Sequence, residues 1–134
     1  MVEEQLKKKE IKYKGKTMEE LKALDTREFA KYVGSRERRT ILRQFREIED
    51  FVNRATRKLS KKKQIKTHQR DLVVVPKMLG MKIQIYNGKE FIAVEITGEM
   101  FGHKFGEFAP TRGKIKHGSA GVGATKGSRA LAKK

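Results

Sequence analysis

Apolar residues gather in one part of the chain, residues 71–108, where they form short runs and alternations. A continuous apolar run at 72–75 is typical of a buried strand, and the proline that follows it ends that strand. Two further apolar segments then face each other across Asn87-Gly88, the dipeptide that most strongly favours a β-hairpin. The pattern therefore predicts a small, mainly antiparallel sheet.

The register of the hairpin decides which residues share a face. With a two-residue turn, Tyr86 pairs with Lys89, and Ile83 lies opposite Ile92. One face is then apolar, and its members are Met81, Ile83, Ile85, Ile92, Val94 and Ile96. We expect this face to cover the core, with a short helix after Thr97 lying over the sheet.

Two capping boxes predict two short helices before the sheet. Thr17 with Glu20, and Asp25 with Glu28, have the spacing at which a cap side chain and a glutamate bond each other's backbone amides. Gly34 is expected to end the second helix in a left-handed conformation. The N-terminal part is therefore predicted to be helical.

A third and longer helix is predicted from apolar residues that recur every three or four positions. They are Ile41, Phe45, Ile48, Val52, Ala55 and Leu59, and Leu42 and Phe51 widen the stripe. The other faces are rich in arginine. We expect the stripe to pack on the two short helices and the arginines to face a ligand, with an ordinary solvated cationic face as the equal alternative for any one of them.

Charge is unevenly distributed along the chain. The formal net charge is +17 over 134 residues, yet residues 71–108 carry four Lys/Arg and five Asp/Glu. Residues 53–70 carry eight Lys/Arg, residues 109–134 carry seven, and neither segment contains an acid. Self-repulsion of this size opposes compaction unless a polyanion compensates it, so nucleic acid is the expected partner.

These patterns predict an α+β protein in three parts. They are a helical, basic N-terminal extension and linker at 1–66, an α+β core at 67–112, and a Gly-rich basic tail at 113–134. The core contains the small, mainly antiparallel sheet and a short helix, and the tail is extended. The linker at 60–66 and the tail have too few large apolar residues to fold alone, so we expect a partner to order them.

Other classes of protein fit the sequence poorly. Without cysteine there are no disulfides or thiolate metal sites, and the three histidines lack metal-ligand spacing. The apolar runs are far shorter than the ~20 residues of a bilayer span, and the start lacks the apolar segment of a signal peptide. A nuclease built on His103 or His117 with Glu107 would need a pocket that so small a sheet hardly forms. We therefore expect no cofactor, metal, membrane contact or small-molecule substrate.

Residues 102–112, GHKFGEFAPTR, resemble the signature region of the S-nineteen family of small-subunit ribosomal proteins. The resemblance covers 67–112, through RDLVVVPKMLG and the hairpin IYNGKEFIAVEIT. The tail KHGSAGVGATKGSR and the long helical region before KTHQRD are similar to the archaeal and eukaryotic branch. Where the bacterial branch has Ser-Arg-Arg-Ser, this chain has Gln-Arg-Asp-Leu, which leaves Arg70 as the matching cation.

The resemblance implies a cytoplasmic structural protein rather than an enzyme. Members of the family sit in the head of the small ribosomal subunit, bind the 3′ major domain of its 16S-type RNA, and neighbour the S-thirteen family protein. Their C-terminal tail extends toward the decoding region, which implies that the tail here approaches tRNA. A free RNA chaperone or a nucleic-acid-compacting protein outside the ribosome stays the alternative, because charge alone does not separate them.

The residues expected to contact RNA are cations of the two acid-free segments and of the core, since lysine and arginine neutralise phosphates with little base specificity. They are Arg54, Arg57, Lys61, Lys62, Lys63, Lys66, Arg70, Lys77, His103, Lys104, Arg112, Lys114, Lys116, His117, Lys126 and Arg129. Two alternatives stay open: His103 as a helix cap, and an ion pair between Lys104 and Glu107. Phe105 and Phe108 are expected in the core, which makes Tyr86 the better candidate for stacking on a base.

Overall fold

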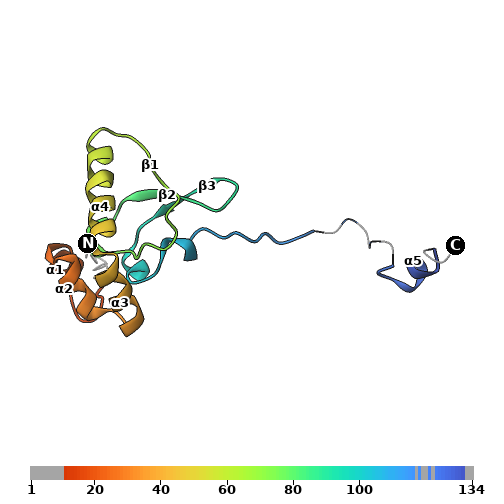
Figure 1. The fold of residues 1–134 in the computed structure, drawn as a ribbon, viewed down its shortest axis with the longest axis horizontal. Helices are drawn as coiled ribbons and strands as arrows, with labels where there is room; N and C mark the ends of the chain where they lie inside the picture. Colours follow the sequence, from red (N-terminus) through yellow and green to blue (C-terminus); the bar gives the residue numbers. More distant parts are fainter. Residues whose placement is uncertain (1–10, 117, 119–120, 122, 132–134) are drawn as a thin grey trace, which may run out of the picture.

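Helices occupy the first part of the described chain and strands its middle (Figure 1). The computed structural model describes residues 11–116, 118, 121 and 123–131. The helices are α1 (Met18–Ala23), α2 (Thr26–Phe29), α3 (Ser35–Arg43), α4 (Phe45–Ser60) and α5 (Lys126–Leu131), and the strands are β1 (Ile65–Thr67), β2 (Lys82–Tyr86) and β3 (Phe91–Glu95). Short 3-10 turns lie at Ala30–Tyr32, Pro76–Met78, Gly98–Met100 and Phe105–Glu107. The predicted α+β class is confirmed.

The sheet has three strands in the order β1-β2-β3, with β1 parallel to β2 and β2 antiparallel to β3. The linker predicted at 60–66 thus ends in a strand, because Ile65 and Lys66 pair with β2. Ile65 and Thr67 point inward and are buried, while Lys66 between them is exposed. Three alternating residues are too short a pattern to predict a strand without its partner.

The hairpin register differs from the prediction by two residues. Ile83 pairs with Val94 and Tyr86 pairs with Phe91, so the predicted pairing of Ile83 with Ile92 is wrong. The reason is the Asn87 side chain, whose Oδ1 accepts hydrogen bonds from the amides of residues 89 and 90 and so builds a wider turn. Because a shift of two preserves the facing of every side chain, the predicted apolar face is nevertheless the inner one.

The apolar run at 72–75 is completely buried, as predicted, but the predicted strand is wrong, because the run forms only an isolated bridge between Val73 and Lys104. The amide of Val74 donates to the carbonyl of His103 at 2.8 Å, and the amide of Phe105 donates to the carbonyl of Leu72 at 3.0 Å. The segment therefore holds the loop that carries the GHKFGEFAPTR sequence.

The predicted third helix is divided at Gln44, where the backbone (φ −97°, ψ 18°) leaves the helical region. Its side-chain Nε2 donates to Asp71 at 2.9 Å. The apolar stripe continues across this break. Its buried members are Ile41, Ile48, Phe51 and Ala55, whereas Leu42 and Leu59 are exposed. Since the apolar spacing continues across residue 44, periodicity alone could not show the interruption.

The N-terminal helices begin as predicted, but the connection to α3 differs. Thr17 and Glu20 form both bonds of a capping box, and Glu28 accepts from the amide of Asp25. Gly34 is extended (φ −60°, ψ 163°) and precedes α3 as its N-cap, so its predicted role as a left-handed helix end is wrong. The chain has already left the preceding helix, because Val33 is extended after a 3-10 turn.

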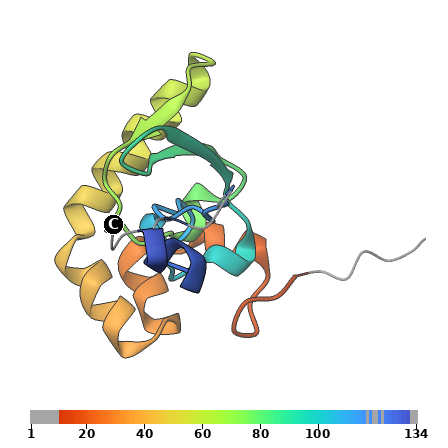
Figure 2. The same cartoon turned by 90° about the vertical axis from the view of Figure 1, so that its right-hand side faces the viewer.

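One hydrophobic core joins the N-terminal helices to the sheet and the signature loop. Phe29 of α2 packs edge-on against Phe101, and Phe51 of α4 packs edge-on against Phe105, with ring centroids 6.0 and 5.3 Å apart. Thr97 precedes a single 3-10 turn rather than the expected helix. Figure 2 shows α4 running along one side of the sheet, where it packs on β1.

Candidate nucleic-acid interface

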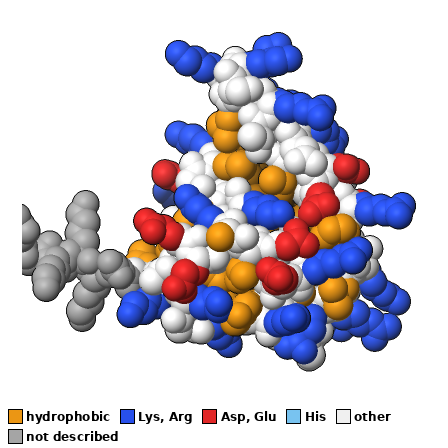
Figure 3. Space-filling model, turned by 90° about the vertical axis from the view of Figure 1, so that its left-hand side faces the viewer, with side chains coloured by type: hydrophobic (Ala, Val, Ile, Leu, Met, Phe, Trp, Pro, Cys, Tyr) orange, Lys and Arg blue, Asp and Glu red, His pale blue; other side chains and the backbone are white. Residues whose placement is uncertain are grey.

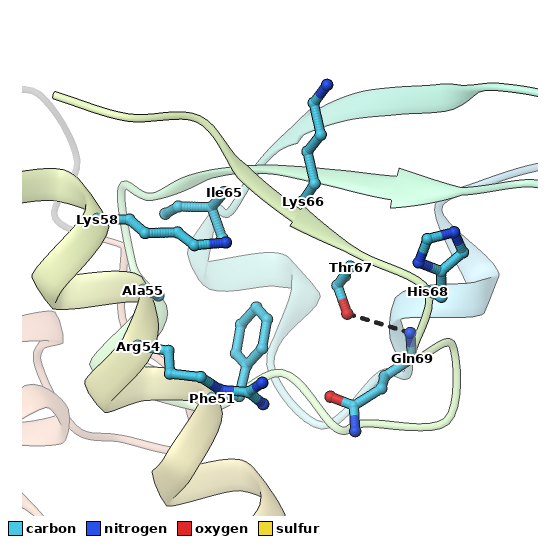
Figure 4. Close-up of a pocket in the computed structure, with 9 residues that line it drawn as sticks. All are labelled: Phe51, Arg54, Ala55, Lys58, Ile65, Lys66, Thr67, His68 and Gln69. Atoms are coloured by element: carbon cyan, nitrogen blue, oxygen red, sulfur yellow. Dashed lines mark hydrogen bonds between the residues drawn. The ribbon is translucent and has the colours of Figure 1, made fainter.

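A groove lies between α4 and the β1 segment (Figure 4). It has a volume of about 270 Å³. Its apolar lining is Phe51, Ala55 and Ile65, and its polar lining is Arg54, Lys58, Lys66, Thr67, His68 and Gln69. Figure 4 shows Arg54 and Lys58 reaching out from α4, and Lys66 rising from the opposite face of the strand. An apolar floor with a cationic rim suits a sugar-phosphate chain.

A second hollow of about 530 Å³ extends the groove, because Arg54 and Gln69 line both. Its other lining residues are Glu47, Asp50, Asn53 and Arg57. The acids belong to the first half of α4, and the cations belong to the second half and to β1. The groove is therefore most positive where residues 53–70 surround it.

The α4 helix ends in a turn that carries three lysines, Lys61, Lys62 and Lys63, all exposed. The amide of Lys63 donates to the carbonyl of Lys58 at 2.9 Å, and Lys62 adopts a positive φ of 52°. Cations are favourable at a helix C-terminus because of the helix dipole. In Figure 3, lysine and arginine side chains gather at this upper tip and around the lower rim, with acids between them.

The side chain of Arg70 forms hydrogen bonds with the protein's own backbone. Its guanidinium donates to the main-chain carbonyls of Tyr86, Gly106 and Ala109 at 2.7, 2.9 and 2.8 Å. It thereby ties the segment after β1 to the end of β2 and to the signature loop. Its structural role was not predicted, because its three acceptors are backbone atoms far away in the sequence.

Lys77 is also engaged within the protein. Its Nζ lies 3.2 Å from Asp25 and 3.9 Å from Glu49, so it joins α2 and α4 to the turn at 76–78. The hydrogen bond from Lys77 is the main cause that lowers the pKa of Asp25 below its ordinary value of 3.8. Lys77 therefore acts as a structural cation, a role that was not predicted.

In the signature loop, His103 Nδ1 lies 2.7 Å from Glu107 Oε2. Glu107 therefore pairs with His103, and the alternative pairing with Lys104 is wrong. Lys104 is half-buried and forms an isolated bridge with Val73. Phe105 is buried as predicted, and Phe108 is half-buried. His103 and Lys104 lie side by side in the loop, apart from the groove lining.

The tail cations lie away from the groove. Arg112, Lys114 and Lys116 are exposed on an extended segment that leaves the body (Figure 1). The tail was predicted to be extended, but its last described part is the short helix α5, which begins at Lys126. Arg129 Nε donates to the carbonyl of Gly123 at 3.2 Å. His117 lies outside the described residues. Among the expected contacts, the structure thus brings together Arg54, Arg57 and Lys66 and separates the tail from them.

Four further cations line hollows but were not among the residues expected to contact RNA, although the arginines of the predicted third helix were expected to face a ligand. Lys58 follows Arg54 by one helical turn, and this spacing of four was the available signal. On α3, Arg36, Arg39 and Arg43 line a hollow of about 190 Å³ together with Thr40. Their spacing of three and four also places them on one helix face.

Other kinds of site find little support in the described part of the chain. Within it, no group of three or more His, Cys, Asp or Glu side chains could hold a metal ion. None of the described helices combines the length and the apolar character that a membrane crossing demands.

Comparison with known proteins gives the family. A family model described as "Ribosomal protein S19" matches residues 27–117. The chain is 42% identical over 123 residues to "Small ribosomal subunit protein uS19" of Methanococcoides burtonii (strain DSM 6242 / NBRC 107633 / OCM 468 / ACE-M), with 92% of this chain and 88% of that protein covered.

The chain belongs to the ribosomal protein S19 family. This confirms the resemblance to the S-nineteen family, and the similarity to an archaeal relative agrees with the expected branch. The family consists of structural ribosomal proteins rather than enzymes. The nucleic-acid partner of this chain is therefore ribosomal RNA. The matched segment contains the whole groove and every expected contact residue except Lys126 and Arg129.

Proposed function

We propose that this chain is a structural constituent of the head of the small ribosomal subunit, where it binds the 3′ major domain of the 16S-type RNA beside the S-thirteen family protein. Its tail then extends toward the decoding region and tRNA. Membership of the ribosomal protein S19 family supports the ribosomal location. One observation supports the RNA-binding surface. The groove between α4 and β1 is surrounded by residues 53–70, which contain no acid.

In this proposal the groove holds a stretch of RNA backbone. Arg54 and Lys58 approach it from α4, and Lys66 lies beside it on the outer face of β1. Each phosphate contact releases condensed counterions, which makes the affinity strongly dependent on salt and nearly independent of sequence. Arginine adds a planar pair of donors that match two phosphate oxygens. Arg70 and Lys77 contribute by fixing the walls of the groove.

The tail has a different task, because it binds without a preformed surface. Arg112, Lys114 and Lys116 are exposed on an extended segment, and the sequence beyond them carries no acid. Such a segment becomes ordered along RNA and meets phosphates as a flexible cationic chain. This is the part that we propose to reach the decoding region.

The test is sedimentation of a tagged full-length chain from lysate. We expect the protein in the small-subunit peak, and we expect Arg54→Gln, Arg57→Gln and Lys58→Gln together to reduce its incorporation severalfold. A variant with Lys22→Gln, Lys31→Gln and Lys89→Gln removes the same charge from exposed positions outside the groove and is the matched control.

Equal incorporation of the groove variant and the control would contradict the proposed surface. A wild-type chain that sediments only with free nucleic acid would overturn the ribosomal assignment. It would favour the alternative, a free RNA chaperone or compacting protein.

A further inference from the structure

Three rings gather on the face of the sheet opposite to α4. The ring centroids of His68 and Tyr86 are 4.7 Å apart, and those of His68 and Phe91 are 5.1 Å apart. Tyr86 and Phe91 complete the cluster with centroids 5.1 Å apart. His68 is exposed, and the other two rings are half-buried. The ring cluster thus stays open to solvent.

The strand register explains why the rings meet. Tyr86 and Phe91 are the cross-strand pair next to the turn, and His68 directly follows β1, the parallel neighbour of β2. The inward-facing residues of the strands, such as Ile83 and Ile85, are buried. Because side chains alternate along strands, the rings share the outer face with Lys66. Figure 4 shows Lys66 pointing away from α4.

The cluster is held in place before any ligand arrives. The Tyr86 hydroxyl donates to the carbonyl of Gly88 at 3.0 Å, and the Tyr86 carbonyl accepts from Arg70 at 2.7 Å. Both ends of this tyrosine are therefore fixed. A prepositioned ring costs little conformational entropy when a flat ligand stacks on it.

Charge around the rings points to a nucleotide. The Lys66 ammonium lies 5.3 Å from the centroid of the Phe91 ring, over its face. Lys66 belongs to the acid-free segment at 53–70, whereas the acids Glu90 and Glu95 lie on the β3 side of the sheet. RNA that passes from the groove around the edge strand β1 therefore meets Lys66 first and the aromatic rings next.

We propose that the ring cluster is a stacking platform for an unpaired base of the small-subunit RNA. The base stacks on Phe91 and Tyr86, and Lys66 turns from the ring face toward the adjoining phosphate. Stacking does not depend on the identity of the base, since every base presents a flat π face. The platform distinguishes unpaired from paired RNA, and it deepens the function proposed above because it relies on RNA being the partner.

The experiment measures binding of the full-length chain to three probes: a short single-stranded oligoribonucleotide, the same strand with abasic sites, and a duplex of equal length. Phosphate contacts are common to the two single strands, so only stacking separates their affinities. We expect the wild type to prefer the strand with bases by about tenfold, the size of one base–aromatic stack.

Three substitutions test the rings. Phe91→Leu keeps apolar bulk and is expected to bring the preference close to one, with duplex affinity unchanged. Phe91→Trp is expected to keep the preference. His68→Ala removes an exposed ring and is expected to reduce the preference without affecting the fold. Phe45→Leu removes a half-buried ring from the start of α4 and is the matched control.

Equal affinity of the wild type for the base-containing and abasic strands would overturn the platform. So would a Phe91→Leu variant that loses affinity equally for all three probes, because that pattern belongs to a hairpin whose aromatic pair is only structural. Either result leaves the ribosomal assignment intact. That assignment depends separately on incorporation into the small subunit.

Discussion

The guanidinium of Arg70 donates a hydrogen bond to the main-chain carbonyl of Tyr86 at 2.7 Å, across 16 positions of the chain. The same guanidinium also holds the carbonyls of Gly106 and Ala109. One side chain therefore fixes the segment beside the groove, the base of the ring cluster and the signature loop. Both proposed RNA surfaces depend on its position.

Arg70→Lys is expected to lower the free energy of unfolding by about 2–3 kcal/mol. The guanidinium makes three charge-assisted bonds to backbone carbonyls, and a single ammonium cannot make all three. Urea unfolding of the full-length chain measures the loss. Arg57→Lys, at an exposed position on α4, is the control and should stay within about 0.5 kcal/mol of the wild type. Equal losses in the two variants would show that the Arg70 bonds do not stabilise the fold.

Gly106→Ala is expected to destabilise the protein by about 1–3 kcal/mol, the usual cost of overpacking. A Cβ at Gly106 would lie 3.1 Å from the Arg70 carbonyl oxygen and 3.3 Å from the Arg70 Cβ. Gly113→Ala is the matched control, since no atom lies within 4 Å of its added Cβ. Thermal unfolding compares the two, and a midpoint for Gly106→Ala as high as that for Gly113→Ala would contradict the close packing.

The ion pair between Asp25 and Lys77 gives stability a dependence on acid pH. Hydrogen bonding from Lys77 lowers the pKa of Asp25 from its ordinary value of 3.8. The pair therefore contributes stability above about pH 3.8, and this contribution is lost as the pH falls through the lower pKa of the folded protein.

The measurement is the unfolding midpoint between about pH 6 and pH 2, compared for the wild type and Asp25→Asn. The difference between them should shrink as the pH falls below about 3.8. Glu90→Gln, at the exposed hairpin turn, controls for the loss of one carboxylate. Parallel curves for the wild type and Asp25→Asn would mean that the Lys77 bond adds no pH-dependent stability.

Salt dependence separates cations that meet RNA from cations that hold the fold. The measurement is the affinity for a fragment of small-subunit RNA at several salt concentrations. Arg54→Gln should reduce the slope of log affinity against log salt by about 0.7–0.9, because it removes one phosphate contact. Lys77→Gln should leave the slope unchanged, because Lys77 is already paired with Asp25 and Glu49. A reduced slope for Lys77→Gln and none for Arg54→Gln would reverse these two roles.

Several features could be predicted because their causes lie close together in the sequence. The Thr17 capping box needs residues three apart, and the inner face of the hairpin needs only alternation. The cationic half of α4 was visible in the same way, since Arg54 and Arg57 lie in a segment without acids. The signature sequence at 102–112 was sufficient to indicate the family.

Other features depend on contacts that sequence periodicity does not contain. The break at Gln44 coincides with a bond to Asp71, 27 positions away, and the apolar stripe passes through it unchanged. The hairpin register depends on two bonds to one asparagine side chain. The structural roles of Arg70 and Lys77 depend on partners that only the folded chain brings near. The sequence thus shows where the cations are, but it does not show which of them stabilise the fold and which are free to contact RNA.

The most direct test is ultraviolet cross-linking of RNA to this protein inside intact small ribosomal subunits, with the linked residues mapped by mass spectrometry. The account predicts links from nucleotides of the 3′ major domain to residues 53–70 around the groove, and to Tyr86 or Phe91 on the sheet. A protein that is present in the subunits but linked only through α1 and α2, with the groove and the rings free of RNA, would contradict it.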